Sequence, residues 1–321
     1  MTITAFWNQH KMKIMLAASI LTAGTSPLLL APSQAHAAAV TVKPTAYINN
    51  VQAAYEVVLR DGTTYAAITD LKPLGNYIFG YDNATKQVTI YDGSDKYTLT
   101  ANSKTMYKNG SAVALSSAPI LVNGKALLPL RAIGEAFGAQ VQWNQSAREA
   151  YIYKTDASAV TGVEYGELTT ARNAALRLPR VSHLAQPQLK TKQDLGIEAT
   201  TDYIFPVKQY SRFFIKENSG LVSYYEVENK TAVLKWQANF GAKAASNPDV
   251  YFIKSNLDKE IGKRPSVAGS GLVQFRYSLM LEEIMYSFFN KTTDIGSGTA
   301  APRYTGNLVV PVPEELNLIS Y

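Results

Sequence analysis

Hydrophobic and polar positions in one stretch of the chain, residues 119–152, follow the pattern of two hairpins joined by a helix. The stretch opens with short β-prone runs on either side of Asn123-Gly124, a dipeptide that favours a two-residue hairpin turn. Leu130, Ile133 and Phe137 then recur at helical spacing. This spacing predicts one short helix with a buried apolar face.

The end of the same stretch predicts the second hairpin. Val141 and Trp143 alternate with polar residues, and Ala150 and Ile152 do the same after a polar turn. We expect Arg131 to support this unit by binding carbonyl groups or a carboxylate near the hairpin, so that its removal would lower thermal stability and leave ligand binding intact. The expected structural core is formed by Leu130, Arg131, Ile133, Phe137, Val141 and Trp143.

A weaker copy of this pattern lies 62 or 63 residues upstream. The turn at Asp61-Gly62 corresponds to the turn at Asn123-Gly124, and Gly75 corresponds to Gly138. A fixed offset predicts an internal duplication. The first copy is degenerate, because Pro73 removes a backbone donor late in its helix.

The second half of the chain predicts a β-meander followed by a helix. Four strand-like runs are separated by turn residues; they span 203–207, 211–216, 221–228 and 231–240. Residues 275–290 place Tyr277, Leu281 and Ile284 at helical spacing, which favours a core-packed helix. A β-hairpin is the alternative, since the run is rich in Tyr and Phe.

The N-terminus has the pattern of an export signal. Lys11 and Lys13 precede an apolar run, and Ala35-His36-Ala37 fits a small-x-small cleavage site. A membrane anchor is less favoured, because polar and helix-breaking residues interrupt the run at 24–27. We therefore expect a secreted or cell-surface protein whose mature chain begins at Ala38 and has no transmembrane segment.

These patterns together predict an α+β fold with two domains, the number that 321 residues favour. The first is mostly antiparallel and contains the two degenerate hairpin-helix-hairpin copies. An Ala-rich helical stripe that Pro179 ends, followed by a polar run with Pro187, is typical of a connector. The expected parts are a signal peptide at 1–37, the first domain at 38–154, the connector at 155–190 and an α+β domain at 191–321.

Several motifs of the first domain resemble those of a known family, the stalk domain of the copper amine oxidase N-terminal type. The matching residues are Val122-Asn123-Gly124, Leu128-Pro129-Leu130-Arg131, Glu135 to Ala139, Val141 and Trp143. The family is common on surface and secreted proteins of Gram-positive spore-forming bacteria. The resemblance covers about residues 44 to 154, and it implies a small antiparallel sheet wrapped on a helix. It also implies a spacer or binding module without chemistry of its own.

The supply of metal-binding side chains argues against copper amine oxidase activity. A copper site of that kind needs several imidazole ligands, whereas the chain has His10, His36 and His183, of which two lie in the expected signal. The same count argues against a zinc hydrolase built on imidazoles. Cysteine is absent, so no thiolate site can form. We expect no metal and no cofactor.

Hydrolytic chemistry has no specific signal either. His183 follows Ser182, but adjacent residues usually point apart, and no nucleophile-elbow sequence occurs. Downstream acids such as Asp194 or Glu198 could complete a triad only by geometry. Paired carboxylates that could cleave glycans are more typical of solvated surfaces; they are Glu226 with Glu228, Glu282 with Glu283, and Glu314 with Glu315. No catalytic residue is predicted.

Charge and aromatic content bear on possible partners. The chain carries 31 Lys plus Arg against 25 acids, spread without a basic run, so nucleic-acid binding has little support. Tyr151, Tyr153 and Tyr224 are candidates for surface binding among 20 tyrosines, since exposed rings can stack on sugars or peptides. The alternative for Tyr151 and Tyr153 is that they cover the sheet edge or contact the second domain.

The sequence therefore predicts an exported, non-enzymatic cell-envelope protein, either a stalk or spacer or a binding module. Its partner would be cell-wall polymer or another surface protein. A secreted hydrolase of glycans or peptides, with its active site in the second domain, is the alternative.

Overall fold

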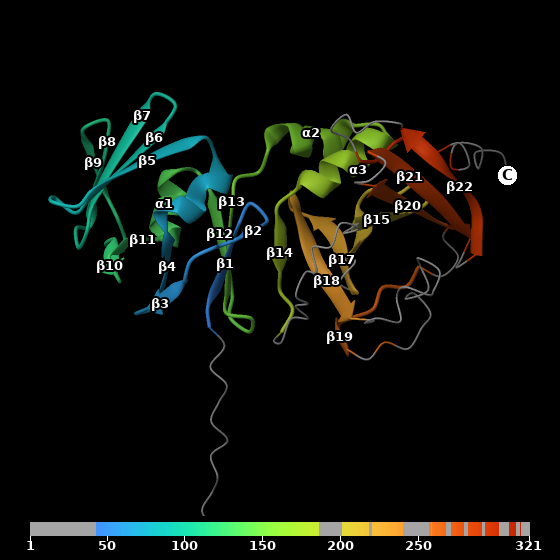
Figure 1. Cartoon of the computed structure of the whole chain (residues 1–321), viewed down its shortest axis with the longest axis horizontal. Coiled ribbons are helices and arrows are strands. Elements are labelled where there is room, and N and C mark those ends of the chain that lie inside the picture. Colours follow the sequence, from blue (N-terminus) through green and yellow to red (C-terminus); the bar gives the residue numbers. More distant parts are fainter. Residues whose placement is uncertain are drawn as a thin grey trace, which may run out of the picture. The chain divides into compact units, whose positions relative to one another are not determined.

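The computed structural model describes residues 43–185, 201–217, 220–239, 257, 259–267, 271–278, 282–290, 293–301, 308–312 and 315. The expected signal peptide at 1–37 lies outside these residues. Residues Val42–Tyr321 form one compact unit (Figure 1). Its fold is mixed α+β with largely antiparallel sheets, as predicted.

Three sheets build the first domain. One has the order β10 (Ile120–Val122), β11 (Lys125–Pro129), β4 (Thr63–Ala67) and β3 (Val58–Arg60). A second has the order β12 (Gln140–Asn144), β13 (Glu149–Tyr153), β1 (Thr45–Ile48) and β2 (Val51–Gln52), with β1 and β13 parallel. The third is an antiparallel meander of β5 (Tyr77–Asp82), β6 (Gln87–Asp92), β7 (Asp95–Thr100), β8 (Thr105–Lys108) and β9 (Ser111–Ala114).

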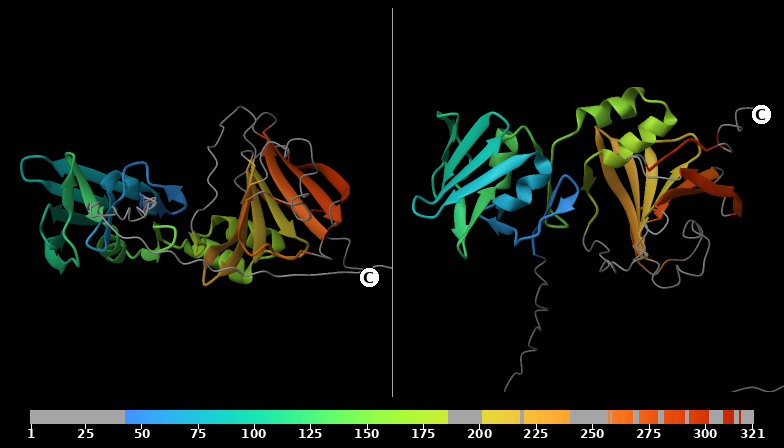
Figure 2. Two further views of the ribbon diagram at one scale, coloured as in Figure 1. Left: turned by 90° about the horizontal axis from the view of Figure 1, so that it is seen from below. Right: turned by 45° about the horizontal axis from the view of Figure 1, so that its top comes forward.

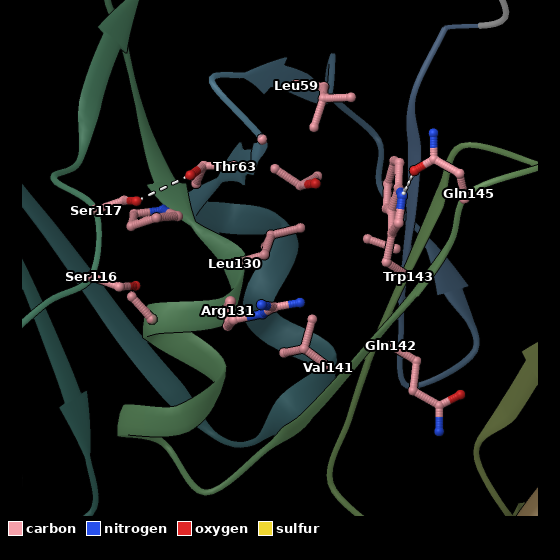
Figure 3. A pocket seen from close by; sticks show the side chains of 15 residues that line it. Leu59, Thr63, Ser116, Ser117, Leu130, Arg131, Val141, Gln142, Trp143 and Gln145 are labelled. Atoms are coloured by element: carbon pink, nitrogen blue, oxygen red, sulfur yellow. Dashed lines mark hydrogen bonds between the residues drawn. The ribbon is translucent and has the colours of Figure 1, made fainter.

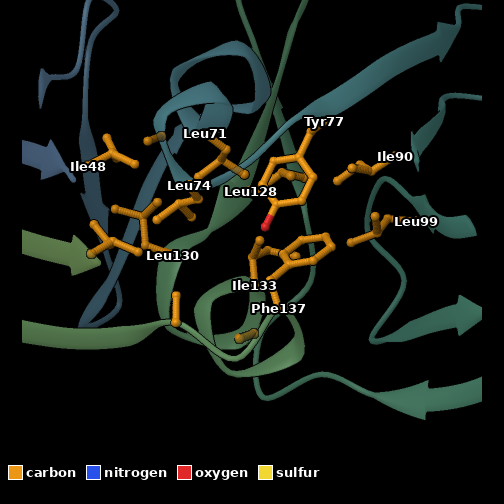
Figure 4. Packing of buried hydrophobic residues seen from close by; sticks show 14 of the residues in the cluster. Ile48, Leu71, Leu74, Tyr77, Ile90, Leu99, Leu128, Leu130, Ile133 and Phe137 are labelled. Carbon is orange, nitrogen blue, oxygen red and sulfur yellow. The ribbon is translucent and has the colours of Figure 1, made fainter. Parts of the chain in front are cut away.

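Two short helices fill the space between these sheets. The 3-10 helix η1 spans Ile68–Leu74, and α1 spans Leu130–Ala136. Leu130, Ile133 and Phe137 are buried in the main core of this domain, as predicted (Figure 4). Val141 and Trp143 are half-buried and pack against the same core. The core is therefore organised around α1, as the helical spacing indicated.

The predicted role of Arg131 in this core is wrong. Its side chain is exposed on α1. Within the part of the chain that the structure describes, it makes no hydrogen bond or ion pair with a carbonyl or carboxylate. The helical spacing that placed Leu130 inward places the next residue about 100° around the helix, where it meets solvent.

Hairpin, helix and hairpin follow one another at both predicted places. Strands β3 and β4, η1, β5 and β6 form the first series, and β10, β11, α1, β12 and β13 form the second. Strands β4 and β11 pair antiparallel with Ala66 opposite Leu128, residues that are 62 positions apart. Equivalent residues of two copies would pair in this way across a local two-fold axis. The duplication itself stays a prediction.

One large sheet forms the second domain (Figures 1 and 2). Its order is β14 (Arg180–Ser182), β18 (Thr231–Asn239), β17 (Leu221–Glu228), β16 (Arg212–Glu217), β15 (Thr201–Pro206), β20 (Gly271–Ser278), β21 (Glu283–Asn290) and β22 (Thr293–Ala301), and β19 (Lys259–Gly262) pairs with β18. Strands β15 to β18 are the four predicted runs, paired in sequence order. The predicted meander is confirmed.

The predicted helix at 275–290 is wrong, and its alternative is right. Strands β20 and β21 form an antiparallel hairpin across this region. The sheet is buried on both faces, with Phe275 and Phe288 in one core and Leu272 and Phe289 in the other. Both the odd and the even positions of these strands therefore carry apolar residues, and some of these residues lie three or four positions apart. This spacing is the same as that of an apolar helix face.

The segment predicted as a connector, 155–190, belongs largely to the second domain. Helices α2 (Ala157–Tyr165) and α3 (Leu168–Arg177) contribute Ala159, Ala175 and Leu176 to the core that covers one face of the large sheet. Strand β14 follows them and pairs parallel with β18. The Ala-rich stripe is helical, as predicted. Its small side chains are buried and let the helix pack closely against the sheet.

Candidate functional site

The three tyrosines predicted as a binding surface are buried, so that prediction is wrong. Tyr151 is 6% exposed, and Tyr153 and Tyr224 are each 2% exposed. Tyr151 and Tyr153 form a cluster with Val181 and Val233 of the second domain, which is the alternative considered from the sequence. The Tyr151 hydroxyl donates to Glu149 Oε2 at 2.5 Å. Tyr224 packs in one core of the second domain.

Burial of several tyrosine side chains makes the free energy of unfolding depend on pH in the alkaline range. Loss of hydration raises the pKa of Tyr77, Tyr153, Tyr224 and Tyr225 above the ordinary value. Their contribution is fully present below the unfolded-state pKa of about 10 and is lost as pH rises through the folded-state values. We expect the urea midpoint to fall from about pH 10 upward. Phenolate absorbance that reached its full change near pH 10 in the folded protein would contradict this.

The described residues do not assemble the hydrolytic constellations considered from the sequence. His183 is exposed, whereas Ser182 is buried. Glu226 accepts a hydrogen bond from the Tyr224 hydroxyl at 2.8 Å, and Glu228 pairs with Lys235 at 2.6 Å. Glu315 is buried against Arg172, while Glu314, Asp194 and Glu198 lie outside the described residues. The described residues contain no group of three or more His, Asp or Glu side chains that could hold a metal ion.

The first domain instead carries an open groove of about 560 Å³ (Figure 3). Four segments line it: the β3–β4 hairpin, the loop before β10, the start of α1, and strands β12 and β13. Its floor is apolar, since Leu130, Ala132 and Ala150 are buried beneath it. The groove therefore lies directly over the core that the helical spacing predicted.

The walls of this groove combine an aromatic ring with hydroxyl groups. Trp143 stands opposite Thr63 and Ser117, with Arg131 between them (Figure 3). The indole Nε1 donates to Gln145 Oε1 at 2.7 Å, which restrains the ring. On the other side the hydroxyls of Thr63 and Ser117 are 3.0 Å apart. An aromatic face and a few convergent polar groups are typical of a small-ligand site.

Comparison with known families places this groove in a recognised domain. Residues 45–152 match the family model of the copper amine oxidase N-terminal domain. Over these residues the chain is similar to that domain. The match spans the three sheets, η1 and α1, and it confirms the resemblance inferred from the sequence motifs. No curated protein matches the chain.

Among the described residues that line the groove, Arg131 is the one with a charged side chain. It lies in the first turn of α1, exposed and without a partner among the described residues. A guanidinium group presents several N–H donors in a planar fork that suits carboxylate or phosphate oxygens. The groove thus offers a cationic donor that the fold itself does not use.

Removal of Arg131 is therefore expected to leave stability nearly unchanged, in contrast to the effect predicted from the sequence. Surface substitutions away from packed or hydrogen-bonded features usually change the free energy of unfolding by less than about 0.5 kcal/mol. Urea denaturation of Arg131→Ala checks this expectation. A loss above about 1.5 kcal/mol would restore a structural role for the side chain.

Sequence reasoning named Trp143 and Arg131, but as parts of the core, and it missed Thr63, Ser117 and Gln145. The hydroxyl-bearing residues come from segments that are far from Trp143 in sequence, so no local pattern joins them. A tryptophan in a strand flanked by Gln and Asn was the available signal, because such a ring is often half-exposed.

No helix within the described part of the chain is long and apolar enough to cross a membrane.

Proposed function

We propose that the chain is an exported, non-enzymatic protein of the cell envelope, in which the copper amine oxidase N-terminal domain is a stalk-like module that binds cell-wall polymer. The observation that carries the proposal is the groove of this domain. Its indole ring, hydroxyl pair and unused guanidinium group suit a polar polymer rather than an apolar ligand.

The pattern at the N-terminus supports export, since a basic start, an apolar run and Ala35-His36-Ala37 are typical of a cleaved signal. An exported protein of the cell envelope is surrounded mainly by wall polymer. The second domain adds contacts to the first through Asn144, whose amide donates to the Ser182 and Leu184 carbonyls at 3.0 Å each.

Incubation of the chain from Ala38 with purified wall sacculi tests the proposal. We expect the protein to sediment with the sacculi while the supernatant stays free of released sugars and peptides. Time-dependent release would instead support the hydrolase alternative. Absence of the protein from the pellet would contradict wall binding, and recovery with extracted surface proteins alone would indicate a protein partner.

A further inference from the structure

We propose that the groove binds an acidic glycan, with a pyranose ring against the indole of Trp143 and a sugar carboxylate on the guanidinium of Arg131. This inference rests on the proposed binding function and names the class of ligand for the same groove. It is carried by the relative placement of an aromatic ring, a single cation and a hydroxyl pair around one apolar floor (Figure 3).

The aromatic ring argues for a ligand that contains a ring of its own. Trp143 is half-buried, and the hydrogen bond to Gln145 restrains its indole where it borders the groove. The C–H groups on one face of a pyranose can pack on such a ring, while the hydroxyl groups at the ring edge remain free for hydrogen bonds. Thr63 and Ser117 supply donors and acceptors across the groove.

The charge of the lining argues for an anionic sugar. Among the described lining residues, Arg131 contributes the one formal charge, and none of them has an acidic side chain that would oppose an anion. A planar carboxylate can accept two parallel hydrogen bonds from the guanidinium fork. A glycerol-phosphate polymer has no ring that could pack on the indole.

The chain offers a direct optical probe of this site. Its three tryptophans are Trp7, Trp143 and Trp236. Trp7 lies within the expected signal peptide, and Trp236 is 0% exposed. In the chain from Ala38, quenching of tryptophan fluorescence by acrylamide therefore reports mainly on Trp143.

The test titrates this chain with tetragalacturonate and, separately, with neutral chitotetraose and a glycerol-phosphate polymer. We expect tetragalacturonate to protect Trp143 from acrylamide and to bind at least about tenfold more tightly than either comparison ligand. Arg131→Gln should weaken tetragalacturonate binding at least about tenfold and leave chitotetraose binding unchanged. Arg177→Gln, which removes an exposed arginine of α3, is the matched control and should change neither affinity.

Three results would overturn the inference: no protection of Trp143, equal affinity for the neutral tetramer, or preference for the glycerol-phosphate polymer. Sedimentation with sacculi separates this failure from failure of the proposed function. Sedimentation that persists in Arg131→Gln, together with no uronate binding, would retain wall binding and exclude the acidic-glycan site. Uronate binding without sedimentation would exclude wall binding and retain the site.

Discussion

Replacement of Glu315 by glutamine is expected to lower the free energy of unfolding by about 3–5 kcal/mol, because it leaves the charge of Arg172 buried without its counterion. The side chains of Arg172 and Glu315 are 2% and 5% exposed. Two hydrogen bonds of 2.7 and 2.6 Å join them as a bidentate pair. The guanidinium also donates to the carbonyls of Gln209 and Pro206, so it is held in place and cannot turn toward solvent.

Glu315 has a further role that adds to this cost. It accepts a hydrogen bond from the backbone amide of Lys208 at 2.5 Å, so that it joins the C-terminal segment to the loop after β15. Val309 and Val312 of the same segment are buried in the core beneath α3. Loss of the carboxylate should therefore loosen this segment as well as the ion pair.

Urea denaturation measures the effect, with Glu228→Gln as the control. Glu228 pairs with Lys235 at the surface, and exposed pairs of this kind contribute about 0–1 kcal/mol. A loss below about 1 kcal/mol in Glu315→Gln would show that the buried arginine finds compensation elsewhere and that the pair does not hold the C-terminal segment.

Replacement of Phe137 by alanine is expected to cost about 3–5 kcal/mol, the range for a buried aromatic side chain. Phe137 is buried in the main core of the first domain (Figure 4). Its ring centroid lies 4.5 Å from that of Tyr97 and 5.1 Å from that of Tyr77, so the substitution leaves a cavity between two strands of the third sheet and α1.

The matched control for Phe137→Ala is Ile78→Ala, which removes an apolar side chain that is 69% exposed in the same domain. Its effect should stay within about 0.5 kcal/mol. Both variants are measured by urea denaturation followed by near-UV circular dichroism. Equal effects of the two substitutions would contradict the assignment of the core.

Local signals predicted much of the first domain. The turn at Asn123-Gly124 joins β10 and β11, where both residues have positive φ, and Gly138 follows α1 at a φ of 68°. These features depend on a few adjacent residues, so a single sequence is sufficient to predict them. The order of hairpins and helices follows from the same signals.

Features that depend on distant contacts were predicted only as alternatives. Tyr151 and Tyr153 lie opposite the apolar face of β13 and would be exposed in an isolated sheet, but Val181 and Val233 cover them. Residues 275–290 carry apolar side chains on both faces because the large sheet lies between two cores. Burial of a second face is decided by segments far away in sequence, and the local period does not record it.

The groove illustrates the same limit for the candidate site. Trp143 and Arg131 are twelve residues apart and could be named from the sequence, but the hydroxyls opposite them come from Thr63 and Ser117. Their approach requires the pairing of β4 with β11, which joins the two halves of the domain. A binding site of this kind becomes visible only when the sheets are assembled.

The central claim is that this groove binds the wall, and the most direct measurement is the fraction of protein that sediments with sacculi in a double variant of the groove. Trp143→Leu with Arg131→Gln should lose most of the sedimenting fraction. The control combines Tyr165→Ala with Arg177→Gln, which removes an exposed aromatic residue and an exposed arginine elsewhere, and it should sediment as the unchanged chain does. Equal sedimentation of both double variants would contradict the account.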